Sequence, residues 1–135
     1  MKYLMFILLL IFFYGCDPGY HIYISNKSSK ELLILTSPSI ESLYDPNIAY
    51  YDSILNHKLK EENGISTYSI RPYEQFRVFG NIGGIPTLKD LPFNYIKIVQ
   101  EKDTLVLNSK EKILKSLIRE NKKINHFYFK FNAME

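Results

Sequence analysis

Residues 93–118 read FNYIKIVQEKDTLVLNSKEKILKSLI, and this stretch decides the fold class. Two apolar runs, residues 93–100 and 104–107, are joined by the short polar segment Glu101-Lys102-Asp103. Short apolar runs separated by a few turn residues are typical of an antiparallel β-hairpin. The stretch therefore predicts a pair of strands in an antiparallel sheet.

An amphipathic helix is expected directly after this hairpin. Asn108 lies three residues before Glu111, which is the spacing of a reciprocal helix N-cap. The helix would run to about residue 120 and carry an apolar stripe along one side. The residues of this stripe are Ile113, Leu114, Leu117 and Ile118. We expect the stripe to cover one face or edge of the sheet.

Two strands that form a hairpin are expected at the start of the domain. Residues 20–25 alternate between apolar and polar side chains, and residues 32–35 form a continuous apolar run. The turn residues Asn26-Lys27-Ser28-Ser29 lie between them. Alternation with a period of two predicts a half-buried strand, and the short apolar run predicts a more deeply buried one.

Three further segments are strand candidates. Residues 65–70 and 74–79 alternate, and the second of them places Arg77 on the side opposite Phe76 and Val78. Residues 124–131 are expected to form the final strand, after the helix. The apolar side chains expected to face inward on it are Phe127, Phe129 and Phe131. The pattern predicts a mainly β (α+β) fold, an antiparallel β-sandwich or open barrel of about six or seven strands with one helix in the C-terminal half.

Residues 37–63 show no dominant period. We expect a long connection, with a strand or a short helix within residues 48–59 as the alternative. The partner-binding candidates in this connection are Tyr44, Tyr50 and Tyr51. Tyrosine offers a large, rigid contact area with a polar tip, which suits a protein partner or a sugar. The alternative is that these rings pin the connection to the sheet; Tyr23 and Tyr128 would extend a binding surface if their strands are adjacent.

An apolar segment precedes the first expected strand. Met1–Cys16 reads MKYLMFILLLIFFYGC, in which a lysine and a run of apolar residues lead to a glycine and the only cysteine of the chain. A helix needs roughly 20 apolar residues to cross a bilayer. The segment is shorter than that, and its order is that of a cleaved secretory signal.

The end of this segment, Phe13-Tyr14-Gly15-Cys16, resembles the lipobox of bacterial lipoproteins. In that family a diacylglyceryl group is attached to the cysteine sulfur, and the peptide is cut just before this cysteine. The resemblance implies a signal peptide over residues 1–15, lipidation at Cys16 and a short tether over residues 16–19. The alternative is an uncleaved signal anchor in which Cys16 is one more small apolar residue.

Residues 20–135 are expected to form a single β-rich domain that needs neither a disulfide nor a metal to fold. The chain has a formal net charge of +3, and residues 1–15 hold one basic residue and no acidic one. So small a positive surplus argues against a nucleic-acid partner.

The chain also resembles a group of small lipoproteins of the Bacteroidota type. The resemblance lies in Cys16, in YHIYISNKSSKELLI at residues 20–34 and in the stretch at residues 93–118. It implies a domain held on a membrane of the bacterial cell envelope through lipid on Cys16, facing the periplasm or the cell surface. Any further partner would be an envelope protein or a glycan.

Motifs of catalysis are missing from the sequence. It contains no zinc-protease, serine-hydrolase or nucleotide-binding motif and no Cys-x-x-Cys pair, so we expect no cofactor, no metal and no catalytic residue. The three histidines, His21, His57 and His126, are far apart in sequence, which favours surface histidines over a metal site.

Three functions remain open at this point. The first is a non-catalytic binding or accessory subunit of the envelope. The second is an immunity or inhibitor lipoprotein that acts against an envelope-acting enzyme. The third is a small hydrolase that uses loop carboxylates such as Asp45 and Asp52.

Overall fold

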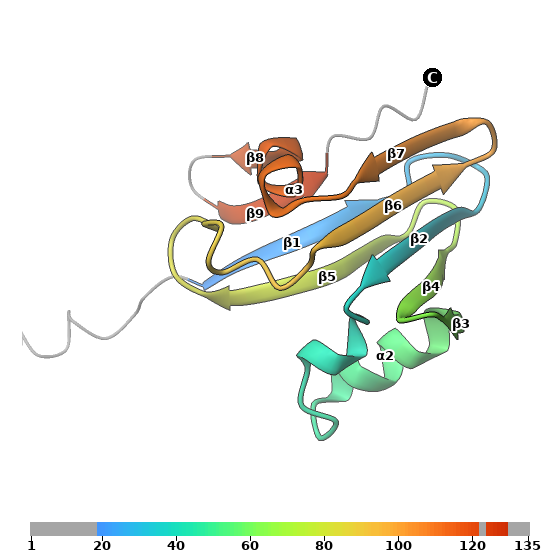
Figure 1. Cartoon of the computed structure of the whole chain (residues 1–135), viewed down its shortest axis with the longest axis horizontal. Coiled ribbons are helices and arrows are strands. Elements are labelled where there is room, and N and C mark those ends of the chain that lie inside the picture. Colours follow the sequence, from blue (N-terminus) through green and yellow to red (C-terminus); the bar gives the residue numbers. More distant parts are fainter. Residues whose placement is uncertain (1–18, 122–123, 130–135) are drawn as a thin grey trace, which may run out of the picture.

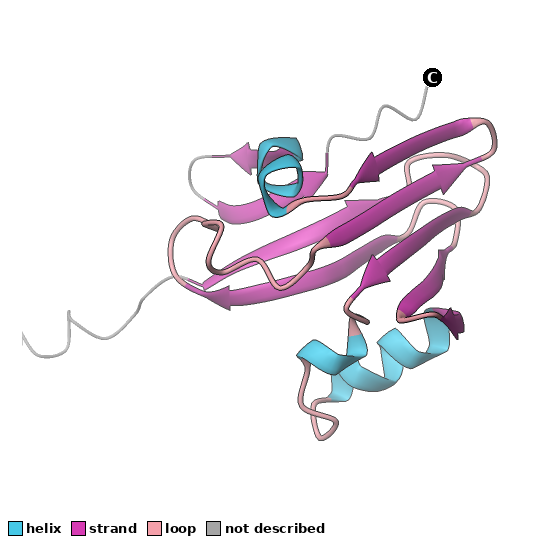
Figure 2. Ribbon diagram, viewed as in Figure 1, coloured by secondary structure: helices cyan, strands magenta, loops and turns pink. Residues whose placement is uncertain are grey.

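The computed structural model describes residues 19–121 and 124–129 of the chain. Within these residues, nine strands form two separate sheets, and two α-helices and a short 3-10 helix lie between strands (Figures 1 and 2). The mainly β, sandwich-like fold is confirmed, and the described strands do not close into a barrel. The expected signal peptide and Cys16 lie outside the described residues.

The first sheet has four strands in the spatial order β5-β1-β9-β8. Their bounds are Gln75–Ile82 for β5, Gly19–Ser25 for β1, Ile124–Phe129 for β9 and Leu117–Asn121 for β8. β1 runs antiparallel to β5 and parallel to β9, and β8 runs antiparallel to β9. Among the described strands, β5 and β8 are therefore the edges of this sheet.

The second sheet has five strands in the order β3-β4-β2-β6-β7, and every neighbouring pair is antiparallel. Their bounds are Lys58–Glu62 for β3, Ile65–Ile70 for β4, Leu32–Ser37 for β2, Tyr95–Gln100 for β6 and Asp103–Leu107 for β7. The pairing of β6 with β7 confirms the hairpin predicted from the stretch at residues 93–107.

One hydrophobic core lies between the two sheets. Alternate residues of the strands are buried in it, as the period-two pattern predicts. Two aromatic rings from different sheets are in contact in this core: the centroids of Tyr68 on β4 and Phe76 on β5 lie 6.2 Å apart. Phe127 and Phe129 on β9 are buried as expected, whereas Phe131 lies outside the described residues.

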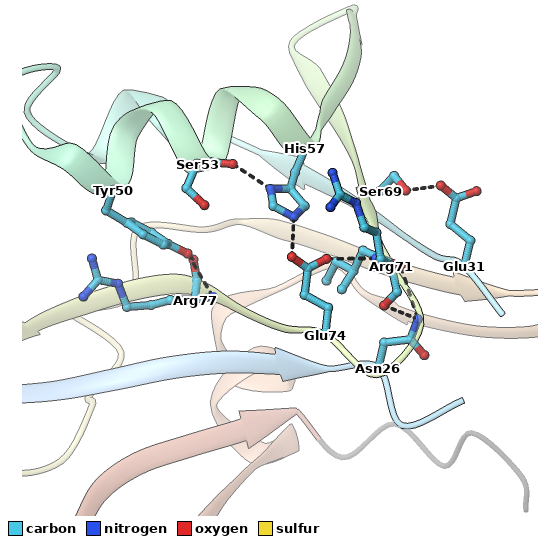
Figure 3. A network of polar contacts seen from close by, with 10 residues as sticks. Asn26, Glu31, Tyr50, Ser53, His57, Ser69, Arg71, Glu74 and Arg77 are labelled. Atoms are coloured by element: carbon cyan, nitrogen blue, oxygen red, sulfur yellow. Dashed lines mark hydrogen bonds and ion pairs between the residues drawn. The ribbon is translucent and has the colours of Figure 1, made fainter. Parts of the chain in front are cut away.

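The expected hairpin between residues 20–25 and 32–35 is wrong, because β1 and β2 belong to different sheets. The buried side chain of Asn26 explains the crossing. Its amide nitrogen donates to the carbonyls of Lys30 at 2.7 Å, Arg71 at 3.0 Å and Ile70 at 3.2 Å, the last two at the end of β4 (Figure 3). These bonds carry the chain from β1 into the other layer instead of turning it back.

The connection over residues 37–63 contains regular structure. A 3-10 helix, η1, spans Glu41–Leu43, and α2 spans Ala49–His57, directly before β3. Ile54 on α2 is fully buried, so burial of this helix against the rest of the fold stabilises it. None of the described helices is long and apolar enough to cross a membrane.

The helix after β7 is shorter than expected. α3 spans Lys110–Ser116, and its N-cap is Ser109, whose hydroxyl accepts from the Lys112 amide, rather than Asn108. The residues from Leu117 onward form β8 because they pair with β9. The predicted apolar stripe is therefore divided: Ile113 is buried in the core, while Leu117 belongs to a strand.

Candidate functional site

Arg77 on β5 is surrounded by two of the predicted tyrosines. Its guanidinium carbon lies 4.2 Å from the ring centroid of Tyr50 on α2 and 5.4 Å from that of Tyr44, which follows η1. These two rings meet edge to face with their centroids 5.6 Å apart. Contacts between a guanidinium and aromatic faces are attractive and hold the cation in one position. The connection therefore places two rings around one fixed positive charge.

The hydroxyl of Tyr50 also binds the backbone of Arg77 (Figure 3). It donates to the Arg77 carbonyl at 2.6 Å and accepts from the Arg77 amide at 3.0 Å. Burial, together with the neighbouring Tyr44, raises the pKa of Tyr50 to about 12. Because β5 is an edge strand, this side chain satisfies backbone groups for which no neighbouring strand is described.

The structure divides the three predicted tyrosines into two groups. Tyr44 and Tyr50 pin the connection to the first sheet, and burial raises the pKa of Tyr44 despite the nearby Arg77. Tyr51 is half-buried on the same helix, but within the described part of the chain the rings packed on Arg77 are those of Tyr44 and Tyr50. For these two residues, the contacts therefore agree with the alternative that the rings hold the connection over residues 37–63 on the sheet.

Two further tyrosines lie beside Arg77 on the outer face of the first sheet. Tyr23 on β1 is paired in register with Arg77 on one side and with Tyr128 of β9 on the other. The rings of Tyr23 and Tyr128 stack with centroids 5.7 Å apart and planes inclined by 26°. Their strands are adjacent, which meets the condition for these two residues to extend a binding surface.

These residues form one continuous surface, which we call the aromatic band: Tyr44, Tyr50, Arg77, Tyr23 and Tyr128. Tyr44 and Tyr50 pack on the Arg77 guanidinium. Tyr23 is paired in register with Arg77, and its ring stacks on that of Tyr128, so the five residues are connected by direct neighbours. All five side chains are half-buried, so the band is both fixed and accessible. The sequence pattern places Arg77 on the polar side of its strand, and that pattern alone does not identify it as a site residue.

His21 continues the outer face toward the start of β1. It is paired in register with Gly80, and a Cβ atom at Gly80 would lie only 2.5 Å from His21 Nδ1. The imidazole therefore lies over a position that only glycine leaves open. The rings of His21 and Tyr23 are 6.1 Å apart in an edge arrangement, so His21 adjoins the band.

A buried carboxylate ties η1 to the second sheet. Glu41 accepts from the ammonium of Lys58 and from the hydroxyl of Tyr68, and this hydroxyl in turn accepts from the Ile40 amide at 2.7 Å. Burial disfavours the ionised form of Glu41, yet these two donors outweigh it and hold its pKa below the ordinary value. Burial raises the pKa of Tyr68 to about 12. Every member is bonded, which favours a structural role over a reactive one.

His57 is a structural histidine at the end of α2. Its Nε2 lies 2.8 Å from the Glu74 carboxylate and its Nδ1 lies 2.6 Å from the Ser53 carbonyl (Figure 3). Its side chain is only 10% exposed, so the expectation of a surface histidine is wrong at this position. Both ring nitrogens are occupied by these contacts. For His126, the structure describes the position of the backbone in β9 alone.

The two carboxylates considered for a hydrolase, Asp45 and Asp52, lie on a turn and on α2 respectively. Asp45 accepts from the backbone and side-chain nitrogens of Asn47, both at 2.9 Å, which is the arrangement of a turn cap. Asp52 is exposed on α2. In the part of the chain that the structure describes, no group of three or more histidine, cysteine, aspartate or glutamate side chains is placed to hold a metal ion.

Comparisons with known proteins add no relative. No family model matches the chain, and neither a curated protein nor a solved structure matches it, so the candidate site is defined by the chain's own residues.

Proposed function

We propose that the protein is a lipid-anchored lipoprotein of the bacterial cell envelope that acts as a non-catalytic binding or accessory subunit. In this proposal, acyl chains on Cys16 hold the domain on a membrane, and the aromatic band binds an envelope protein. The observation that carries the proposal is the register Arg77–Tyr23–Tyr128 across three adjacent strands, which presents a cation and two rings on a face turned away from the core.

The composition of the band supports a protein partner. Tyrosine and arginine are among the residues most enriched at the energetic centres of protein interfaces, because they bury large areas and still provide polar groups. Gln75 adds to this surface, since its amide donates to the Tyr128 hydroxyl at 3.0 Å. The side chains are already held by contacts within the chain, so binding costs little conformational entropy.

The N-terminal segment supports the anchor. Its single lysine, its apolar run and the Gly15-Cys16 ending have the order of a lipoprotein signal. One acyl chain gives only marginal attachment, whereas two or more hold a protein on a bilayer almost permanently. A binding module fixed in this way would meet partners only at one membrane surface.

Site-specific photocrosslinking in the native host tests the proposal. A photoreactive amino acid replaces Ser25, on the outer face of β1 two residues from Tyr23, and the matched control replaces Ser69 on the second sheet. Both serines are half-buried, and they lie on the outer faces of different sheets. We expect a discrete protein adduct from position 25 and none from position 69.

Two results would contradict this proposal. Equal adducts from both positions would mean that the band has no special role in binding. An adduct with glycan and none with protein at position 25 would replace the protein partner by a sugar. The Tyr23→Ala substitution, combined with the label at position 25, is expected to reduce the protein adduct about tenfold, because hot-spot tyrosines contribute on the order of 1.4 kcal/mol or more.

A further inference from the structure

The end of β5 and the connection from β5 to β6 display apolar side chains to solvent. Ile82 is 76% exposed, Ile85 61% and Leu88 41%. We call residues 82–88 the apolar loop. Large aliphatic side chains grouped in this way, rather than scattered singly, mark a surface that contacts a partner or a membrane.

The apolar loop is held in place by the chain around it. Pro86 within it, and Leu91 and Phe93 just after it, are buried. Asp90 accepts from the amide and the hydroxyl of Thr87 at 3.0 and 2.7 Å. The outward position of the three aliphatic side chains is therefore part of an ordered connection that also places apolar residues in the core.

The loop lies at the end of the molecule where the described chain begins. Gly19, the first residue of β1, is paired in register with Ile82, and Figure 1 shows the β5–β6 connection at the end where β1 starts. Cys16 precedes Gly19 by three residues, and three residues of fully extended chain span at most about 11 Å. A lipid chain on Cys16 would thus enter the bilayer within about 11 Å of the backbone beside Ile82.

We propose that the apolar loop inserts into the boundary between headgroups and acyl chains of the bilayer to which Cys16 is anchored. This inference rests on the proposed lipid anchor and adds a second, non-covalent contact to it. Apolar side chains at this depth gain burial, while neighbouring polar groups remain hydrated. Lys89 and Asp90 give the adjoining segment both a positive and a negative residue, so insertion depends on apolar contact and takes place in zwitterionic lipid.

Two contacts would fix the orientation of the domain, which a single point of attachment cannot do. Tyr23 is four residues along β1 from Gly19, or about 13 Å at the rise of a strand. The aromatic band would then be presented just above the headgroup layer. A partner bound there would itself lie at the membrane surface.

Fluorescence quenching tests the insertion, because the chain contains no tryptophan of its own. The full-length lipidated protein is prepared with Ile85→Trp, and the matched control carries Tyr73→Trp. Tyr73 is 74% exposed and precedes the start of β5, so it lies at the opposite end of that strand from the loop. Both variants are reconstituted into phosphatidylcholine vesicles, with and without lipids brominated near the headgroup end of the acyl chains.

We expect bromine to reduce the emission of the Ile85→Trp protein about twofold and to shift it to shorter wavelength, as for an indole at the membrane interface. The Tyr73→Trp protein is expected to show neither change. Vesicle-bound protein whose two tryptophans respond equally would overturn the inserted loop and leave the anchor standing. Protein that carries no acyl mass and remains in solution would overturn the anchor and, with it, this inference.

Discussion

The hydroxyl of Tyr50 binds both backbone groups of Arg77, the carbonyl at 2.6 Å and the amide at 3.0 Å. A side chain of α2 thus occupies the place that a neighbouring strand takes in a sheet. The same ring lies 4.2 Å from the Arg77 guanidinium. One residue therefore both protects the edge of β5 and positions the charge at the centre of the aromatic band.

Removing this hydroxyl should destabilise the fold. We expect Tyr50→Phe to lower the free energy of unfolding by about 2 kcal/mol, because it leaves two partly buried backbone groups without their partner. Urea unfolding measures the difference. Tyr51→Phe, on the same helix, is the control and is expected to change stability by about 0.5 kcal/mol or less. Equal losses from the two variants would show that the hydroxyl of Tyr50 has no special part in holding the edge.

The ion pair between Glu41 and Lys58 should make stability depend on pH. The pKa of Glu41 is held below its ordinary value in the folded state. Its contribution is therefore fully present above the ordinary carboxyl range and is lost as pH falls through the lower, folded value. At neutral pH we expect Glu41→Gln to cost about 2 kcal/mol, since it leaves the partly buried Lys58 with a weaker partner.

Unfolding of both proteins at neutral pH and below about pH 3 measures this dependence. The stability difference between wild type and Glu41→Gln should shrink in acid. Glu62→Gln is the control, because Glu62 is 67% exposed in its pair with Lys60, and exposed pairs contribute about 0–1 kcal/mol. A difference between wild type and Glu41→Gln that is the same at both pH values would argue against a stabilising carboxylate.

Asn26 should be among the least replaceable polar residues. It is 1% exposed, and its side chain bonds the carbonyl of Ile70 while accepting from Gln100 at 3.1 Å. We expect Asn26→Ala to lower the free energy of unfolding by about 3 kcal/mol, because several buried groups lose their partner together. Asn47→Ala, at an exposed turn, serves as the control. Similar unfolding midpoints for the two variants would refute this role.

Gly80 should tolerate no side chain beside His21. A Cβ atom there would lie 2.5 Å from His21 Nδ1 and 3.0 Å from the Tyr20 carbonyl oxygen. We expect Gly80→Ala to displace the imidazole and to cost about 1–3 kcal/mol, as overpacking does. Gly84→Ala is the matched control, since nothing lies within 4 Å of its added atom. Chemical shifts of the His21 ring that stay unchanged in Gly80→Ala would contradict the close approach.

The local sequence pattern predicted where the strands lie better than it predicted which strands pair with each other. The two runs at residues 93–107 pair as a hairpin, because the turn between Gln100 and Asp103 holds only two residues. The similar pattern at residues 20–35 does not form a hairpin, since Asn26 bonds the end of β4 and the chain passes from the first sheet to the second. α2 has no clear period of its own; burial of Ile54 stabilises it. Leu117 fitted a helical stripe equally well, and pairing with β9 places it in β8.

The candidate site was predicted only in part, because local sequence pattern does not determine which distant residues come together. The tyrosines can be selected from the sequence because each carries a large ring with a polar tip. The fold meets the condition that the strands of Tyr23 and Tyr128 are adjacent. Arg77 was missed as the centre, because its neighbours come from β1 and from residues 27 to 33 positions away in sequence. Contacts of this kind follow from the tertiary arrangement and leave no periodic signal.

We propose that a lipid on the thiol of Cys16 fixes this domain to a bilayer. Intact-mass spectrometry of the protein, extracted with detergent from the envelope of its native host, is the decisive measurement of this anchor. We predict a chain that begins at Cys16 and carries the added mass of a diacylglyceryl group. A chain that retains residues 1–15 and has an unmodified Cys16 would show that the domain is not held by lipid on this residue.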